Sequence, residues 1–336
     1  MGSRANYVVV EGGDWTLHRS HWGAGRVATD LAHGPAAATR CFRANSRVDD
    51  ALRTDPDGWL DDVWCEGAAL VDHDRRMLLW YCDEWDGWAR YAAQRAVLAR
   101  TWPGWEIRWA SDGLGDLHDH LGLGRGFTRR DAEPQEAGAP FWERPDEDDT
   151  RTLLTVRRPD GRVRAWGSPL EVVDQLGGGE ALLGLLPDDA SVPGLATMPD
   201  SGIHLDQLTR TIGVWTTVPM VGLRSWPLPG WAGWELCLWG DDHTRQAAAS
   251  DDVVHLPEVD LTAELRRWLE RVGEPPLDSW PRILQALAPP PGSELTAVVN
   301  PSAAVPHAGP EPTGAERVAL RAAFAAVLAE QPGAGG

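Results

Sequence analysis

One unusual phrase occurs twice in this chain of 336 residues. Residues 102–109 read WPGWEIRW, and residues 229–239 read PGWAGWELCLW. Trp22–Gly23 and Trp166–Gly167 form a second matching pair, each followed at the same spacing by Asp and then Gly. Similarity within a chain at a long, regular spacing indicates that one supersecondary unit has been repeated. The sequence therefore predicts an internal duplication.

A third matching pair lies between the other two. Residues 67–80 align without gaps over residues 202–215, with Gly67/Gly202, Leu70/Leu205, Arg75/Arg210 and Trp80/Trp215 as the matches. Along the chain the three pairs stand 144, 135 and 129 positions apart, as a shorter second copy requires. The alternative is coincidence, since 19 Trp residues must produce some Trp–Trp matches. Three pairs in one order favour duplication.

The repeat predicts an α+β fold. Each copy has the pattern of a hairpin, a helix, a second hairpin and a final strand, with a helix before that strand in the first copy only. We expect module one over 5–122 and a degenerate module two over 151–250, with antiparallel sheets packed around a pseudo-two-fold axis. Residues 123–150 have the composition of a linker or long loop. Residues 251–336 form a helical C-terminal segment with a Pro- and Ala-rich stretch.

The C-terminal segment has clear helix signals. Residues 260–273 form an expected helix bounded by Asp and Gly, and 278–287 a second, shorter one. Thr313 and Glu316 have the spacing of a capping box. An apolar row follows, and we expect it to dock on the body of the chain: Leu320, Phe324, Val327 and Leu328.

The charge of the chain restricts its partners. Fifty acidic and 31 basic residues give a net charge of −19, and every basic residue is Arg. Such a surface repels phosphate backbones, so we expect no nucleic acid, and it attracts basic proteins. No apolar run approaches the length of a membrane span, and the four Cys residues are isolated. We therefore expect a soluble cytoplasmic protein with reduced thiols and no membrane association.

No motif for a cofactor or a metal is present. His18 and His21 are spaced to point to opposite faces of a strand, and His118 and His120 to diverge on a helix. The glycine-rich stretches at 122–126 and 177–180 lack the strand-to-helix context of a nucleotide site. The sequence thus predicts neither a metal nor a cofactor.

Polar residues in the first copy are candidates for catalysis. Where the copies align, the first has acidic and imidazole groups and the second has none, so we expect any polar site in module one. The candidates for acid–base catalysis are His21, which directly precedes Trp22, and the carboxylates of Glu66 and Asp72. Simple divergence of surface positions is the alternative. The aligned residues are His21/Ala165, Glu66/Ser201, Asp72/Gln207 and Asp74/Thr209.

Indole has replaced the other aromatic rings, with 19 Trp against 4 Phe and 3 Tyr. We expect the matched Trp residues to form the core of each module. Other Trp residues are candidates for an exposed ligand-binding face, because aromatic side chains are enriched at interfaces. The ligand-binding candidates are Trp22, Trp59, Trp85 and Trp88, and Trp142 is a further unmatched residue.

These features favour a non-catalytic binding protein that recognises a basic partner protein, as an immunity or inhibitor protein does, or an aromatic small molecule. The alternative is an enzyme of the hydrolase or isomerase type, with its polar site in module one. A third hypothesis is a scaffold that recruits partners through residues 313–336. The sequence leaves the oligomeric state open.

Overall fold

The computed structural model describes residues 3–82, 87–128, 142, 150–188, 192, 194–225, 228, 230–272, 305 and 307–331. The chain divides into two compact units. Unit 1 comprises Met1–Asp83, Ala93–Arg108 and Thr262–Gly336, and unit 2 comprises Glu84–Ala92 and Trp109–Leu261. Most of the predicted linker 123–150, the predicted helix 278–287 and Trp85 lie outside the described residues.

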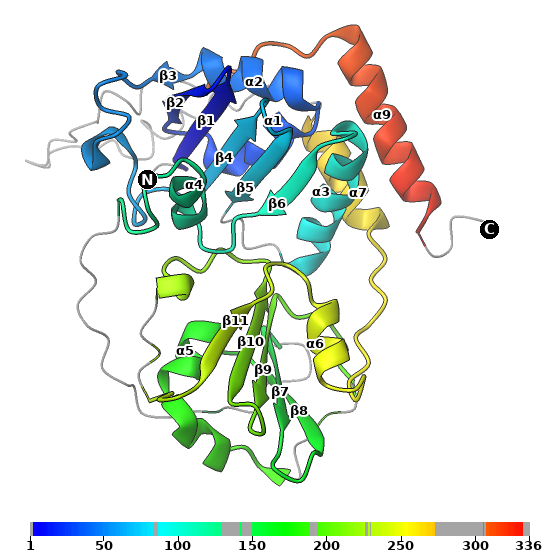
Figure 1. The fold of residues 1–336 in the computed structure, drawn as a ribbon. Helices are drawn as coiled ribbons and strands as arrows, with labels where there is room; N and C mark the ends of the chain where they lie inside the picture. Colours follow the sequence, from blue (N-terminus) through cyan, green and yellow to red (C-terminus); the bar gives the residue numbers. More distant parts are fainter. Residues whose placement is uncertain are drawn as a thin grey trace, which may run out of the picture. The chain divides into compact units, whose positions relative to one another are not determined.

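Unit 1 is built on a six-stranded sheet with the order β3-β2-β1-β4-β5-β6 (Figure 1). Its strands are β1 (Ala5–Glu11), β2 (Asp14–Ser20), β3 (Ser46–Arg47), β4 (Gly67–Asp72), β5 (Met77–Cys82) and β6 (Glu106–Trp109). Its helices are the 3-10 helices η1 (Ala24–Arg26) and η2 (Pro56–Gly58), and α1 (Val27–Leu31), α2 (Pro35–Ala44), α3 (Trp88–Thr101, shared with unit 2), α7 (Thr262–Val272) and α9 (Gly314–Ala329).

The sheet is mixed, so the prediction of antiparallel sheets was wrong. β1 and β2 form an antiparallel hairpin, but β4 pairs with the other edge of β1 in the parallel sense. β4 is not joined to β1 by a tight turn, because β2, α1, α2, β3 and η2 separate the two strands in the chain. Parallel neighbours need such a long connection, whereas a tight turn joins antiparallel strands.

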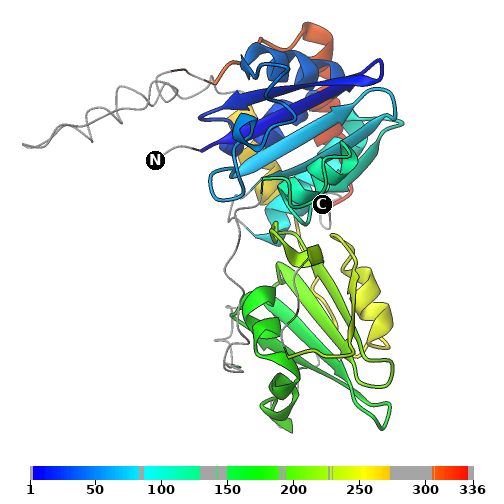
Figure 2. The ribbon, with the colours of Figure 1, turned by 60° about the vertical axis from the view of Figure 1, so that its left-hand side comes forward.

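Two layers of helices complete unit 1. Phe42 of α2 stacks on Tyr7 of β1, with ring centroids 4.3 Å apart, so α2 covers that face of the sheet. In α9 the predicted apolar row is buried at Leu320, Phe324 and Val327, and Phe324 packs 5.1 Å from Trp268 of α7. The capping box of Thr313 and Glu316 begins α9, as predicted. α7 and α9 contact each other. In Figure 2 both helices lie behind the strands of unit 1.

Unit 2 has a five-stranded sheet with the order β11-β10-β9-β7-β8. Its strands are β7 (Thr152–Arg157), β8 (Val163–Ser168), β9 (Ser201–Asp206), β10 (Thr211–Thr216) and β11 (Glu235–Leu238). Its helices are α4 (Leu114–His120), α5 (Val172–Gly177), α6 (Thr244–Ala249) and the 3-10 helices η3 (Gly179–Gly184) and η5 (Leu223–Ser225). This sheet is also mixed, because β7 pairs in parallel with β9 and β10 with β11.

A buried glutamine fixes α6 to the sheet of unit 2. The Gln246 amide nitrogen donates to the carbonyl oxygens of Leu153 (3.0 Å) and Ile203 (2.8 Å), and lies 3.1 Å from Thr155 Oγ1. Its amide oxygen accepts the indole N–H of Trp215 at 2.6 Å. Gln246 is 1% exposed, so these bonds are shielded from water.

The two sheets repeat one strand order, and the matching positions differ from those read from the sequence. Asp72 and Asp206 end β4 and β9, and each carboxylate accepts the backbone N–H three residues later. Arg76 and Arg210 then adopt a left-handed conformation, with φ of 51° and 55°. The structure therefore aligns 67–82 with 201–216, one position away from the alignment expected.

This shift of one position separates Trp80 from Trp215. Trp80 pairs with Ala69, which pairs with Tyr7, so its side chain lies on the face covered by α2. Trp215 donates to Gln246, while its neighbour Val214 belongs to the core beneath α5. Successive residues of a strand point to opposite faces, so the two indoles occupy different layers. The shared residue type suggested that Trp80 and Trp215 were equivalent, but each side chain fills a buried site of its own.

Trp22 and Trp166 are not equivalent either. Ser20 and Ser168 are the last residues of β2 and β8, and each hydroxyl accepts the N–H two residues later. Trp22 lies beyond the end of β2 and is half-buried, whereas Trp166 lies within β8 and is fully buried. The serine, and not the tryptophan, marks the common position.

The third pair of segments matches as expected. Trp102 donates its indole N–H to Leu31 O at 2.8 Å and packs edge-on against Trp105. Trp231 donates to Leu176 O at 2.7 Å and packs in the same way against Trp234. These bonds make Leu31 equivalent to Leu176 and therefore Asp30 equivalent to Gln175.

Candidate functional site

Three buried side chains of unit 1 form a polar centre. His307 Nε2 lies 2.9 Å from Asp30 Oδ2 and 3.8 Å from Cys41 Sγ. All three residues are buried, with Asp30 8% and His307 6% exposed. Burying polar or charged side chains costs free energy unless each one has a hydrogen-bond or ion-pair partner. We refer to Asp30, Cys41 and His307 as the polar centre.

Each member reaches the polar centre from a different element. Asp30 projects from α1 and Cys41 from α2, the two helices that cross the sheet between β2 and β4. His307 lies in the segment that precedes α9 and is held by its neighbour Ala308. The side-chain amide of Asn45 donates to Ala308 O at 2.9 Å, and its oxygen accepts from Ala308 N at 3.2 Å.

Further groups surround the polar centre. Ser20 Oγ lies 2.9 Å from His307 Nδ1, so both ring nitrogens of the imidazole have a partner. The Tyr7 hydroxyl lies 3.3 Å from Asp30 Oδ2 and 3.0 Å from Gly23 O. On the other carboxylate oxygen, Arg26 Nε lies 3.8 Å from Asp30 Oδ1.

The electrostatics of the polar centre keep its thiol and phenol protonated. Burial, and then the Asp30 carboxylate, raise the pKa of the Cys41 thiol well above its ordinary value. The same two causes, in the same order, raise the pKa of Tyr7. A thiol of this kind is a poor nucleophile at neutral pH, because the thiolate is the reactive form. The thiolate form of Cys41 requires a cation beside it.

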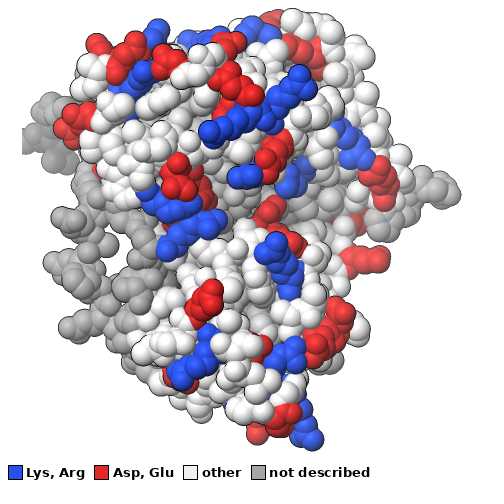
Figure 3. All heavy atoms as spheres, in the orientation of Figure 1, with Lys and Arg blue, Asp and Glu red and all other residues white. Residues whose placement is uncertain are grey.

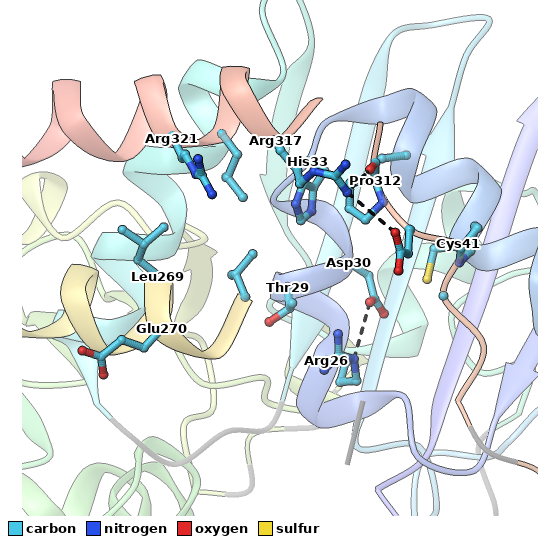
Figure 4. Close-up of a pocket in the computed structure, with 16 residues that line it drawn as sticks. Arg26, Thr29, Asp30, His33, Cys41, Leu269, Glu270, Pro312, Arg317 and Arg321 are labelled. Carbon is cyan, nitrogen blue, oxygen red and sulfur yellow. Dashed lines mark hydrogen bonds and ion pairs between the residues drawn. The ribbon is translucent and has the colours of Figure 1, made fainter. Parts of the chain in front are cut away.

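The polar centre borders a cavity of about 770 Å³ in unit 1 (Figure 4). Asp30 and Cys41 line one end, and α7 and α9 form the walls with Leu269 and Leu320. Charged groups occur around it: Arg26, Asp30, Glu270, Glu311, Arg317 and Arg321. This volume falls within the range of about 300–1,000 Å³ that is usual for small-molecule sites.

The charges of the cavity are partly paired. Arg26 faces Asp30, and Arg317 Nη1 lies 3.9 Å from Glu311 Oε2. Arg321 of α9 and Glu270 of α7 have no hydrogen-bond or ion-pair partner within the described part of the chain. One cationic group and one anionic group therefore remain available in the lining.

His21, a catalytic candidate from the sequence, lies in a second and smaller cavity of about 340 Å³. Arg4, Ser20 and Asn45 line this cavity with it. Burial first, and then the charge of Arg4, lower the pKa of His21. Its ring packs edge-on against Trp22, with centroids 4.9 Å apart.

The other two catalytic candidates lie at opposite ends of one strand. Glu66 immediately precedes β4, and its carboxylate accepts the backbone N–H of Arg4 at 2.8 Å. Asp72 ends β4 and caps the following turn through Arg75 N. Six residues of an extended strand span about 20 Å. Glu66 therefore lies near the cavity that holds His21, and Asp72 does not.

The tryptophan candidates for ligand binding are dispersed. Trp59 is 4% exposed and donates its indole N–H to Arg53 O at 2.8 Å. Trp88 is half-buried in the part of α3 that belongs to unit 2, and it packs edge-on against His243 of the same unit. Trp142 packs against the core of unit 2. The structure instead exposes Trp64, which was not among the candidates.

In the described part of unit 2, the positions that correspond to Ser20, Asp30 and Tyr7 hold uncharged side chains. Ser168 and Gln175 correspond to Ser20 and Asp30, and they contact each other directly, at 2.6 Å. Leu154, paired with Trp166 in β7 and β8, takes the place of Tyr7. The expectation of a functional site in the first copy stays a prediction, and the candidate residues named for it differ from the polar centre. The signal available in the sequence was Asp30 against Gln175, which the alignment of Asp30 with Asp174 concealed.

A comparison of the chain with protein-family models, with curated proteins and with solved structures found no match. Within the part of the chain that the structure describes, every helix is too short or too polar to span a bilayer.

Proposed function

We propose that unit 1 is a binding module for a small molecule that carries both an anionic and a cationic group. The observation that supports this most is the cavity of about 770 Å³, which has apolar walls and ends at the polar centre. Large cavities with apolar linings and a few convergent polar groups are the usual sites of small-molecule recognition. The position of the cavity and the polar centre in unit 1 supports module one as the functional half.

The chemistry of the ligand follows from the groups that remain available. Arg321 presents a planar guanidinium suited to a carboxylate or phosphate, and Glu270 presents an acceptor for an ammonium group. Leu269 and Leu320 offer apolar contact between the two ends. A zwitterion with an apolar body, such as a free amino acid or a dipeptide, matches this pattern.

The proposal predicts selective stabilisation by zwitterions. In a thermal-shift assay, free amino acids or dipeptides with apolar side chains should raise the Tm of the full chain, because a ligand that binds only the folded state stabilises it. Arg321→Ala should weaken the best ligand roughly 10- to 100-fold, the loss expected for one charge-assisted hydrogen bond of about 1.5–3 kcal/mol.

Arg267→Ala is the matched control. Arg267 also projects from a helix of unit 1, but it pairs with Glu264 on α7 and does not line the cavity. This variant should bind the ligand as the unmodified protein does. Equal stabilisation by simple carboxylates, by simple amines and by zwitterions would contradict the proposed charge pattern.

An exposed acidic loop favours a second candidate function, the recognition of a basic protein. Between β3 and β4 of unit 1, Leu52, Val63 and Trp64 are 44%, 67% and 48% exposed. Six aspartates lie among them: Asp49, Asp50, Asp55, Asp57, Asp61 and Asp62. On the face drawn in Figure 3, Arg residues alternate with Asp and Glu. The net charge of the chain therefore does not by itself point to a binding surface, whereas the concentration of aspartates in this loop does.

A basic partner would dock beside Trp64, whose ring carries the Arg4 guanidinium 4.6 Å from its centroid, and the six aspartates would supply the attraction. Exposed aromatic side chains of this kind are frequent interface hot spots. The association rate of a partner co-purified from the native host should fall steeply as salt is added. Trp64→Ala should weaken the complex at least about 30-fold, as expected for a hot spot of about 2 kcal/mol. Leu208→Ala, at a residue of unit 2 that is 56% exposed, is the control. A rate that does not depend on salt would exclude this mode of recognition.

We infer further that the two units descend from one duplicated module. The shared strand order, the Ser20/Ser168 pair and the left-handed Arg76/Arg210 pair support this history. The pseudo-two-fold packing of the modules stays a prediction, and so does the cytoplasmic location.

A further inference from the structure

We infer that the polar centre is a zinc site, with Asp30 Oδ2, Cys41 Sγ and His307 Nε2 as ligands. One ligand atom from each of these residues lies within 4.8 Å of the other two. Carboxylate, thiolate and imidazole are the three ligand types that zinc prefers in proteins. This inference does not depend on which molecule occupies the cavity.

The spacing of the three atoms fits a tetrahedral ion. Bonds of about 2.0–2.3 Å to zinc place neighbouring ligand atoms about 3.3–3.8 Å apart. His307 Nε2 and Cys41 Sγ are 3.8 Å apart, whereas His307 Nε2 and Asp30 Oδ2 are 2.9 Å apart. Zinc therefore requires the second pair to separate by a few tenths of an ångström.

The groups around the polar centre already orient its ligands. Ser20 Oγ lies 2.9 Å from His307 Nδ1, where it can accept the Nδ1–H and leave Nε2 as the metal ligand. Arg26 faces Asp30 Oδ1, whereas Oδ2 faces His307 Nε2 and can keep the Tyr7 hydroxyl as a second partner when it binds the ion. Partners of this kind fix the tautomer and direction of metal ligands.

Charge provides a separate argument. A zinc ion with one carboxylate and one thiolate is neutral overall, which suits a buried site. With three protein ligands the fourth position of the ion is open, as in catalytic rather than structural zinc sites. Asp30 and Cys41 also line the large cavity, so this open position would face the proposed ligand.

The test is a zinc titration of the full chain after removal of metals by a chelator, with no small molecule present. We expect about one zinc ion per chain with a Kd below about 1 μM. Co²⁺ in place of zinc should give a thiolate-to-cobalt charge-transfer absorption. Cys41→Ser should abolish this absorption and weaken zinc binding at least about 100-fold.

Cys65→Ser is the matched control, because Cys65 is another buried thiol of unit 1 and lies outside the polar centre. It should bind zinc as the unmodified chain does, and so should Arg321→Ala, even if Arg321→Ala no longer binds a zwitterion. Near-ultraviolet circular dichroism should show that each variant is folded.

Ser20→Ala supplies a second variant that removes no zinc ligand. It should weaken zinc binding about 10- to 100-fold by loss of the hydrogen bond to His307. The inference is overturned if the unmodified chain binds no zinc saturably, or if Cys41→Ser or Ser20→Ala binds it equally well. In that case Asp30, Cys41 and His307 only attach residues 307–309 to α1 and α2.

Discussion

Replacing Gln246 by Glu is expected to destabilise unit 2 by about 4 kcal/mol or more at neutral pH. The substitution keeps the shape of the side chain, but it replaces the amide nitrogen that donates to Leu153 O and Ile203 O by an oxygen. A buried negative charge would then face two carbonyl oxygens at about 3 Å. The midpoint of urea denaturation measures the loss.

Gln331→Glu is the matched control, because it adds the same charge at a half-buried position in unit 1. There the side chain donates to Val327 O, at the end of α9. An acidic group at the C-terminal end of a helix costs about 0.3–1 kcal/mol. If both variants lose the same stability, the amide of Gln246 is not what holds α6 to the sheet.

Acidification is the second change with a large expected effect on unit 2. Burial lowers the pKa of His118 to about 4, from an ordinary 6.5, and burial also lowers the pKa of His204 to about 4. Between pH 6.5 and 4 the unfolded chain binds protons that the folded unit does not, so stability falls as the pH falls through this interval. Each histidine should account for about 3 kcal/mol.

Hydrogen exchange of β9 and β10 in the full chain reports this loss, after correction for intrinsic exchange rates. His204→Gln should remove one titrating group and about half of the pH dependence, as should His118→Leu in α4. The Thr155 hydroxyl, 2.9 Å from His204 Nδ1, can bond to a glutamine amide in its place. Exchange that is equally slow at pH 7 and pH 4.5 would show that both rings are protonated in the folded state.

The element types of both modules could be predicted from the sequence, but the sense of the strands could not. Turn signals marked the first hairpin of each module, and the capping box of Thr313 and Glu316 marked the start of α9. The parallel pairing of β1 with β4 depends on the path of the chain through β2, α1, α2 and β3, which no local pattern contains. The alignment of Trp80 with Trp215 failed for a related reason, because a residue name does not say which face of a sheet it fills.

The polar centre was beyond sequence reasoning for a different reason. Asp30 and Cys41 are 11 positions apart on separate helices, and His307 follows 266 positions later, in a Pro- and Ala-rich stretch. Metal motifs are recognisable when their ligands share one helix or one loop. Here three elements must pack first, and only then do the side chains meet.

Unit 1 is interrupted by unit 2 in the chain, and this order has a consequence for synthesis. All the residues of unit 2 have left the ribosome once Leu261 has emerged, whereas unit 1 still lacks α7, His307 and α9. Domains fold during translation as soon as their residues are available. A nascent chain should thus carry a folded unit 2 together with an incomplete unit 1. A product truncated after residue 261 should be unable to complete the fold of unit 1.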